Sequence, residues 1–409
     1  MSQPIKQQLL SKWKIGDSVL DVLVGGVSFL DSKDGFKGSF PNEDSAERFL
    51  GAYGFDLHDP IEKAELHGTL QEALRFIKTY FLKPAAESGL PIEIPKKIAE
   101  INDIHELLLQ AGADSESTLR HWACSVLRVI HTISHVDRDI RTHYFSDIQT
   151  QILDRFYRYL QRDENGQLYI GKSPEDPLRV DLVEFQVKPK KARDSTLMKL
   201  LHKPGSVAEE LFDRVGVRFV TRTRLDAIRL IHFLEQRNIV VAANIKPSRS
   251  RNTLIDTDTL KSRIGADLSK VIEGRMEEGE FINELNKVEF PKQKTGENPF
   301  SSDHYRAIQF TCRQLIKIKN PLSDYIRDLK KITRGVNLDP AIALAIEKVD
   351  QKYIQRVTRF FYPYEIQVMD EVSHVENEKG RSAHKAYKRA QQKAAMMRVM
   401  GALANEAKG

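Results

Sequence analysis

Two acidic side chains that are distant along the chain could act together in catalysis. Glu365 interrupts the apolar stretch YPYEIQV, and Asp213 begins the β-prone segment DRVGVRFV. Side chains of a strand alternate between its two faces, so Glu365 and Gln367 share one face. The opposite face is apolar and contains Tyr362, Tyr364, Ile366 and Val368. If the two strands converge, Asp213 and Glu365 would form a magnesium site or an acid/base pair.

Basic and aromatic residues elsewhere in the chain suit a nucleotide. A cluster of basic residues precedes Asp213 and comprises Lys188, Lys190, Lys191, Arg193, Lys199 and Lys203. The polar turn ENPFSSDH holds Phe300 and His304. Lysines for phosphates, carboxylates for magnesium and an aromatic ring for a base together make a nucleotide site. A basic run is also often only a solvated face, and Phe300 could equally fold into the core.

The spacing of apolar residues predicts the elements that must position these side chains. Three- and four-residue spacing from Glu43 to about Tyr159 indicates helices, and we assign residues 1–160 to a helical domain. Strands are predicted at 213–220, 238–245 and 304–318, and an amphipathic helix joins the first two in a β-α-β succession. We therefore expect an α+β fold, a mixed β-sheet flanked by helices. We expect the domain that contains this sheet to span 161–409, with helical insertions near 254–292 and 319–358.

Composition sets limits on the class of protein. The chain has 409 residues with a net charge of +6, which permits a phosphate-rich partner without demanding one. Its two cysteines, Cys124 and Cys312, lie in apolar periodic segments, so we expect buried thiols and no disulfide framework. No long apolar run indicates a signal peptide or a membrane span. We expect a cytoplasmic protein without a membrane partner.

Four motifs, in this order along the chain, resemble the synthetase domain of the RelA/SpoT family, the enzymes that make the alarmone (p)ppGpp. The family's KxxxSxxxK element is similar to Lys191, Ser195 and Lys199, and its DxxGxR strand to Asp213, Gly216 and Arg218. Its NGYxSxH turn aligns with residues 298–304. Its EIQ strand and the helix after it match Glu365, Ile366, Gln367, His374, Glu378, Gly380, Ala383, His384, Tyr387 and Lys388. The resemblance covers roughly 185–250 and 297–390.

The resemblance implies a nucleotidyltransferase-like fold and an ATP-dependent pyrophosphokinase. In such an enzyme the 3′-hydroxyl of a guanine nucleotide, GDP or GTP, attacks the β-phosphorus of ATP and AMP leaves. By the same resemblance Asp213 and Glu365 would be catalytic and hold Mg²⁺. The donor phosphates would be bound by Lys191, Arg193, Ser195 and Lys199. The acceptor would be bound by Asn298, Phe300, His304 and Gln367.

Several positions differ from the family pattern and leave other functions open. Pro189 replaces a donor-stacking arginine, for which Arg193 could substitute, Pro299 replaces a glycine, and Met369 replaces an arginine. The alternatives are pyrophosphorylation of a tRNA 3′ end or another nucleotide, and a catalytically inactive nucleotide-binding or regulatory module.

The dipeptide His58-Asp59 is similar to part of the His-Asp metal hydrolase found in long members of the family. Pro60 follows at once, and the next residues, IEKAEL, provide no acidic pair to complete such a site. We therefore expect Asp59-Pro60 to form a turn that opens a helix.

Overall fold

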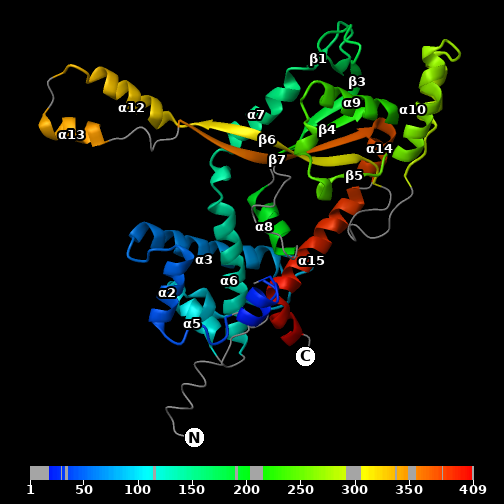
Figure 1. Cartoon of the computed structure of the whole chain (residues 1–409). Helices are drawn as coiled ribbons and strands as arrows, with labels where there is room; N and C mark the ends of the chain where they lie inside the picture. Colours follow the sequence, from blue (N-terminus) through cyan, green and yellow to red (C-terminus); the bar gives the residue numbers. More distant parts are fainter. Residues whose placement is uncertain are drawn as a thin grey trace. The chain divides into compact units, whose positions relative to one another are not determined.

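The chain folds as two compact units, and each draws on separate stretches of sequence (Figure 1). The computed structural model describes residues 18–28, 30–32, 36–113, 117–188, 192–202, 215–291, 305–336, 339–348, 356–379 and 381–407. Among them, the first unit takes those in Met1–Ile140, Lys191–Leu211 and Gly380–Gly409. The second takes those in Arg141–Lys190 and Phe212–Lys379.

The first unit is helical and is called the helical unit. Its elements are the π-helical turn η1 (Ser18–Val24), α2 (Glu43–Tyr53), α3 (Pro60–Tyr80), α4 (Lys96–Ala99), α5 (Ile104–Gly112), α6 (Thr118–Asp137), α8 (Arg193–His202) and α15 (Arg381–Glu406). Asp59 caps the start of α3 by accepting a hydrogen bond from the Ile61 N–H, and Pro60 occupies the first turn. The predicted helix-opening turn at Asp59-Pro60 is confirmed.

Two distant segments complete the core of the helical unit. Helix α6 is buried around most of its circumference and contains Trp122, which is 2% exposed. Against it pack Leu197, Leu200 and Leu201 of α8 and the C-terminal residues Ala395, Met396, Val399, Met400, Leu403 and Ala404. Both segments fall within residues 161–409, which were expected from the sequence to form one other domain. Apolar spacing finds the helices but does not show with which unit a helix packs.

Half-buried His131, which lies beside the exposed His135, gives the helical unit an acid-sensitive stability. The Tyr53 hydroxyl lies 2.7 Å from His131 Nδ1, and the rings of His131 and His135 are 4.4 Å apart. Burial lowers the pKa of His131 to about 4, and the neighbouring His135 adds to this shift. In the unfolded chain the group titrates near its ordinary value of 6.5. The unfolded state therefore binds more protons between these values, and stability is lost as the pH falls from 6.5 toward 4.

We expect the helical unit to be about 2 kcal/mol less stable at pH 5 than at pH 7.5, because of His131 alone. Trp122 is buried in this unit, so its fluorescence during urea unfolding, in a Trp13→Phe background, measures the unit. His131→Asn should flatten the decline, whereas His58→Asn, at a side chain that is 87% exposed, should keep it. Equal declines in wild type and His131→Asn would contradict this assignment.

The second unit is built on a mixed sheet and is called the sheet unit. Its strands are β1 (Leu160–Arg162), β2 (Leu168–Ile170), β3 (Val180–Val187), β4 (Gly216–Thr221), β5 (Arg251–Asn252), β6 (Ile308–Lys319) and β7 (Val357–Asp370). Within the described residues they form one sheet in the order β1-β2-β3-β4-β7-β6-β5. Strands β4 and β7 are parallel, and the other neighbours are antiparallel. The expected mixed sheet flanked by helices is thus present.

The core of the sheet unit lies on one face of this sheet. Helices α7 (Phe145–Tyr157) and α9 (Arg224–Gln236) pack there (Figure 1). The strand residues beneath them are Val217, Phe219, Ile308, Phe310, Cys312, Tyr364, Ile366 and Val368. The predicted apolar faces of the strands around 308–312 and 362–368 are confirmed, and both cysteines are buried thiols.

The strand predicted at 238–245 is wrong. Ile239 and Val240 are buried, but the chain then forms the short 3₁₀ helix η4 (Ala242–Asn244) and makes a single bridge from Ile245 to Cys312. The strand parallel to β4 is β7, from much later in the sequence. Buried apolar residues of a loop carry the same local pattern as a short strand, which explains the error.

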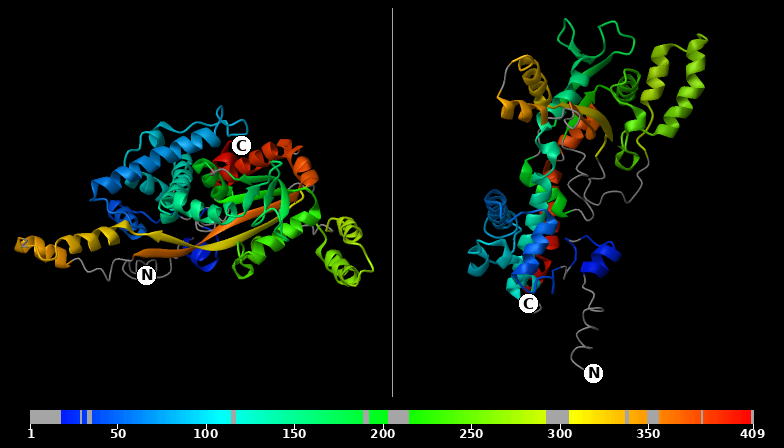
Figure 2. Two further views of the ribbon diagram at one scale, coloured as in Figure 1. Left: turned by 90° about the horizontal axis from the view of Figure 1, so that it is seen from above. Right: turned by 60° about the vertical axis from the view of Figure 1, so that its left-hand side comes forward.

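The remaining helices of the sheet unit leave the sheet at two places. Helices α10 (Thr257–Ile272) and α11 (Glu278–Asn286) pack on each other. Helices α12 (Pro321–Ile332) and α13 (Pro340–Lys348) follow β6 and precede β7 in the sequence, and they extend away from the sheet (Figure 2). The 3₁₀ turn η5 (Pro247–Arg249) precedes β5, and α14 (Glu371–Lys379) follows β7. A further 3₁₀ turn, η2 (Ile140–Thr142), lies where the two units meet in the sequence. No described helix is long and apolar enough to cross a bilayer.

Candidate functional site on the polar face of the sheet

The face of the sheet opposite α7 and α9 carries polar side chains in rows across the strands. Strand registers place Gln186, Arg218, Gln367, Gln309 and Arg251 side by side on β3, β4, β7, β6 and β5. The next row contains Gly216, Glu365 and Thr311. Because directly paired residues point to the same side of a sheet, these side chains form one surface, here called the polar face. The predicted pairing of Glu365 and Gln367 on a polar face is confirmed.

Glu365 is the buried anion at the centre of this polar face. Its residue is 7% exposed. Lys188 Nζ donates to one carboxylate oxygen, and the Gln309 side-chain amide donates to the other. An ionised carboxylate in such a position is costly without partners, and here both oxygens are satisfied. Glu365 is therefore held in one orientation as a charged group.

Gly216 makes this arrangement sterically possible. Lys188 leaves the end of β3, and its side chain must cross β4 to reach Glu365 on β7. A Cβ at position 216 would lie 2.8 Å from Lys188 Cδ and 3.4 Å from its Cγ, which is closer than carbon atoms pack. The absence of a side chain at Gly216 thus opens the path between Lys188 and Glu365. Lys188 was noted in the sequence only as part of a basic cluster.

Arg218 organises the neighbouring row. Its guanidinium donates to Gln367 Oε1 at 3.3 and 3.4 Å and to Gln186 Oε1 at 3.3 Å. These are neutral partners, so the positive charge of Arg218 is oriented without being cancelled by them. Gln367, predicted from the resemblance as an acceptor-binding residue, has its amide oxygen engaged by this arginine.

Tyr305 is a site residue that sequence reasoning missed. Burial raises the pKa of its hydroxyl, which also lies within the electrostatic influence of Arg218, Glu365 and Arg251. The ring packs on a small apolar cluster on the same side of the sheet, formed by Val220, Ala307 and Met369. Its position one residue after the polar turn 297–304 was the only signal in the sequence.

Met369 occupies the position where the family pattern has an arginine. It lies two residues beyond Gln367 and is 1% exposed within that apolar cluster. Helix α14 packs nearby: the Asn377 amide donates to the Arg306 carbonyl at 2.9 Å and accepts from the Arg306 N–H at 3.1 Å. His374 of α14 lies 3.5 Å from Glu184 on β3. His374 therefore serves to hold the helix against the sheet.

A magnesium site was expected at Asp213 and Glu365, and of these two Glu365 lies within the described residues. Magnesium takes oxygen ligands, commonly one or two carboxylates, and Glu365 offers one carboxylate on this face. The second expected ligand, Asp213, lies outside the described residues, as do Lys191, Asn298, Phe300 and His304. Among the described residues, no group of three or more potential metal ligands is present.

Three of the residues predicted to bind the donor phosphates lie on α8 in the helical unit. Ser195 is exposed, Lys199 is half-buried, and Arg193 is bound by acidic residues. The Arg193 guanidinium donates to both carboxylate oxygens of Asp137, at 2.8 Å for Nε, and to Glu72. These contacts tie α8 to α3 and α6.

We expect Arg193→Ala to destabilise the helical unit by about 1–2 kcal/mol, because it removes a network of charge-assisted hydrogen bonds. Urea unfolding followed by tryptophan fluorescence measures the loss. Arg75→Ala is the matched control, since Arg75 is more exposed and reaches Glu72 and Asp194 only at 3.7 and 3.6 Å. A raised KM for ATP without a loss of stability would instead support the donor-phosphate role.

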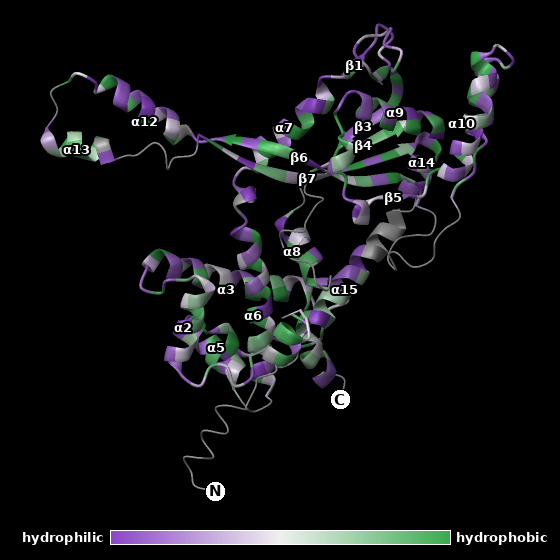
Figure 3. Ribbon diagram, viewed as in Figure 1, coloured by the Kyte–Doolittle hydropathy of each residue, from purple (hydrophilic) through white to green (hydrophobic). Residues whose placement is uncertain are grey.

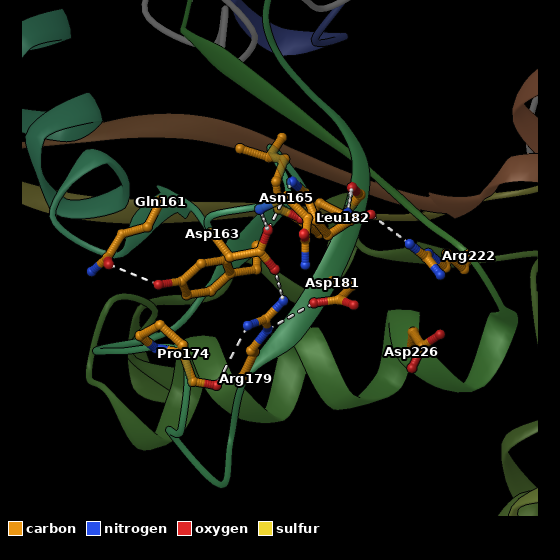
Figure 4. A network of polar contacts seen from close by, with 12 residues as sticks. Gln161, Asp163, Asn165, Pro174, Arg179, Asp181, Leu182, Arg222 and Asp226 are labelled. Atoms are coloured by element: carbon orange, nitrogen blue, oxygen red, sulfur yellow. Dashed lines mark hydrogen bonds and ion pairs between the residues drawn. The ribbon is translucent and has the colours of Figure 1, made fainter.

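A second polar network, on β1 to β3, is structural (Figure 4). Arg179 donates to Asp163 at 2.7 Å and to Asp181 at 2.8 Å, and its guanidinium lies 4.1 Å from the centre of the Tyr169 ring. The same guanidinium lowers the pKa of Asp163. A nearby cavity of about 380 Å³ has more acidic than basic lining residues, namely Glu175, Asp176, Asp181 and Asp226 against Arg179, Arg222 and Arg229. Such a lining does not favour a triphosphate.

Comparisons with known proteins give one structural likeness. No family profile and no curated protein matches the chain. The crystal structure of the small alarmone synthetase 2 from Bacillus subtilis is similar at 12% sequence identity with a TM-score of 0.24, over 68% of this chain and 97% of that one. A likeness this distant carries no argument about function.

Proposed function

We propose that the polar face binds a nucleotide and that the protein transfers pyrophosphate from ATP to the 3′-hydroxyl of a guanine nucleotide. The observation that carries this proposal is Glu365, a buried and oriented carboxylate beside Lys188 and one row away from Arg218. The ordered motifs in the sequence add support. Positioning and charge neutralisation are the main demands of phosphoryl-type transfer, and these residue types meet them.

In this proposal each residue of the polar face has a separate task. Glu365 accepts the proton of the attacking 3′-hydroxyl, whose oxygen bonds to the β-phosphorus of ATP. The bond from that phosphorus to the α–β bridging oxygen breaks, and AMP leaves with this oxygen. Lys188 and Arg218 neutralise phosphate charge. Magnesium, when bound by Glu365 and Asp213, would neutralise further charge on the donor phosphates.

The pairing of Lys188 with Glu365 suits a site that awaits a charged ligand. Each group is the counterion of the other in the protein alone. A magnesium-bound triphosphate carries both positive and negative charge. Its phosphate can therefore replace Glu365 as the partner of Lys188, and its magnesium can replace Lys188 as the partner of Glu365. Lys188 is 24% exposed and on a flexible stem, so its ammonium can turn to a phosphate with little rearrangement.

Nucleotide binding without catalysis is the second candidate function. It is favoured by Met369, which places buried apolar packing at a position where the family pattern has an arginine. The protein would then use the same polar face as a sensor. Both candidate functions require nucleotide binding, and only the pyrophosphokinase converts the bound nucleotides to products.

Incubation with labelled ATP and unlabelled GDP, GTP or tRNA tests the proposal. We expect AMP and a pyrophosphorylated guanine nucleotide to appear in equal amounts. Label transferred to tRNA would identify a tRNA 3′ end as the acceptor. Calorimetric binding of ATP with no AMP release would favour the sensor, and absence of both binding and product would refute either function.

A further inference from the structure

Helices α12 and α13 extend from the sheet unit on a long two-stranded ribbon (Figures 1 and 2). Strands β6 and β7 pair along their full length, from Ile308–Val368 to Lys319–Val357. Only the Ile308 end also pairs with β5, and β4 pairs with β7 only from Glu365 onward. We call the described residues of 313–361 the arm.

Helix α12 exposes an apolar stripe along one side. Large apolar residues recur at spacings of three and four, which places them on the same side of a helix. They are Leu322, Tyr325, Leu329 and Ile332, with exposures of 60%, 69%, 45% and 73%. Val336, Ile342 and Leu344 add exposed apolar surface in the segment after the helix and on α13, and Figure 3 shows hydrophobic residues mixed with hydrophilic ones there. A contiguous exposed stripe of this kind marks an interaction surface.

The arm also has an excess of basic side chains. In the sequence, residues 313–359 contain eleven basic and five acidic side chains, an excess of six. Exposed cations follow the stripe at its C-terminal end, at Lys331 and Arg334. On the ribbon, Lys317 and Arg359 pair across the strands beside the exposed Leu315 and Phe361. The arm therefore combines apolar and cationic surface.

We propose that the arm docks on an anionic lipid surface, with the apolar stripe of α12 in the interface and the cations against lipid phosphates. An amphipathic helix with cationic flanks binds in this way, through apolar burial and electrostatic attraction. Tyr325 has the amphipathic ring that is favoured at the headgroup level. Peripheral docking requires no membrane-spanning segment, so it is compatible with the described helices, none of which could cross a bilayer. It departs from the expectation of a protein without a membrane partner.

Two other occupants fit the arm less well. A second copy of the chain would bring two arms of the same strong positive charge together, which is unfavourable. RNA would match the cations, but it offers no surface that buries a stripe of Leu and Ile side chains, because its apolar contacts are stacked bases on aromatic rings or arginine. A lipid interface satisfies both properties of the arm.

Flotation of the full-length protein with vesicles tests the proposal. We expect binding to phosphatidylcholine vesicles containing about one-third phosphatidylglycerol, and little binding to pure phosphatidylcholine. Leu329→Glu with Ile332→Glu should lower the bound fraction about tenfold, and Lys331→Glu with Arg334→Glu should weaken binding and its salt dependence. Ile272→Glu, at a 77% exposed position on α10, and Lys261→Glu are matched controls that should bind as wild type.

Three results would overturn the proposal. One is no difference between the two vesicle types, and another is equal binding by the arm variants and their α10 controls. The third is a dimer, or a complex with labelled tRNA, that depends on Leu329 and Ile332 while vesicles are not bound. Folding of each variant is verified by its circular dichroism spectrum, and because the substituted side chains are exposed, we expect the spectra to match wild type.

Discussion

Replacing Glu365 with glutamine should abolish product formation, with a loss of at least about 10²- to 10³-fold in kcat. The amide keeps the shape of the side chain, but its single oxygen can accept from only one of the two donors, Lys188 and Gln309. It cannot accept the proton of a hydroxyl, and it is a poor magnesium ligand. The measurement is the rate of AMP release from labelled ATP in the presence of GDP or GTP.

Glu184→Gln provides the matched control for this experiment. It makes the same chemical change on the same side of the sheet, at a carboxylate that is 44% exposed and contacts His374. We expect near wild-type turnover from this variant. Melting curves of both variants separate catalysis from folding. Full activity in a folded Glu365→Gln protein would remove Glu365 from the chemistry and would require another group to accept the proton of the hydroxyl.

Gly216→Ala should reduce turnover about tenfold or more, although position 216 itself has no chemical group to contribute. The added Cβ would lie 2.8 Å from Lys188 Cδ, and Lys188 is the flexible partner that must move. Its displacement takes the ammonium away from Glu365 and from the expected position of the donor phosphates. The fold should survive, because the clash is with a side chain that can reach solvent.

A double-mutant cycle identifies the path of this effect. Lys188→Ala removes the atoms that the new Cβ meets, so Gly216→Ala should cost little further activity in that background. Strictly additive losses would show that Gly216 acts through the backbone of β4 instead of through Lys188. Crystallography or spectroscopy is unnecessary for this test, because four rate measurements suffice.

Sequence patterns predicted the strand faces of the sheet unit well. Alternation along residues 362–368 separated the core side from the polar side, and both predicted partners, Glu365 and Gln367, lie on the polar face. The same period located the buried face of β6. These predictions succeed because burial of one strand face leaves a two-residue period that local sequence retains.

The sequence patterns did not predict which strands pair when they are far apart in the chain. The wrong strand at 238–245 shows that local hydrophobicity does not identify which strand pairs with β4. Lys188 resembled any other member of a basic cluster until the register showed that its route crosses Gly216. For Tyr305 the only sequence signal was its position after the polar turn 297–304, because its place at the site depends on how the chain enters β6.

The two units share a property that follows from their interleaved segments. The helical unit takes part of its core from residues 395–404, and β4 obtains its parallel neighbour only from residues 365–370. During synthesis these segments leave the ribosome after the other parts of their units, so neither core can close before they emerge. We expect nascent chains to remain protease-sensitive until these segments have emerged, and to rely on chaperones that shield apolar surface.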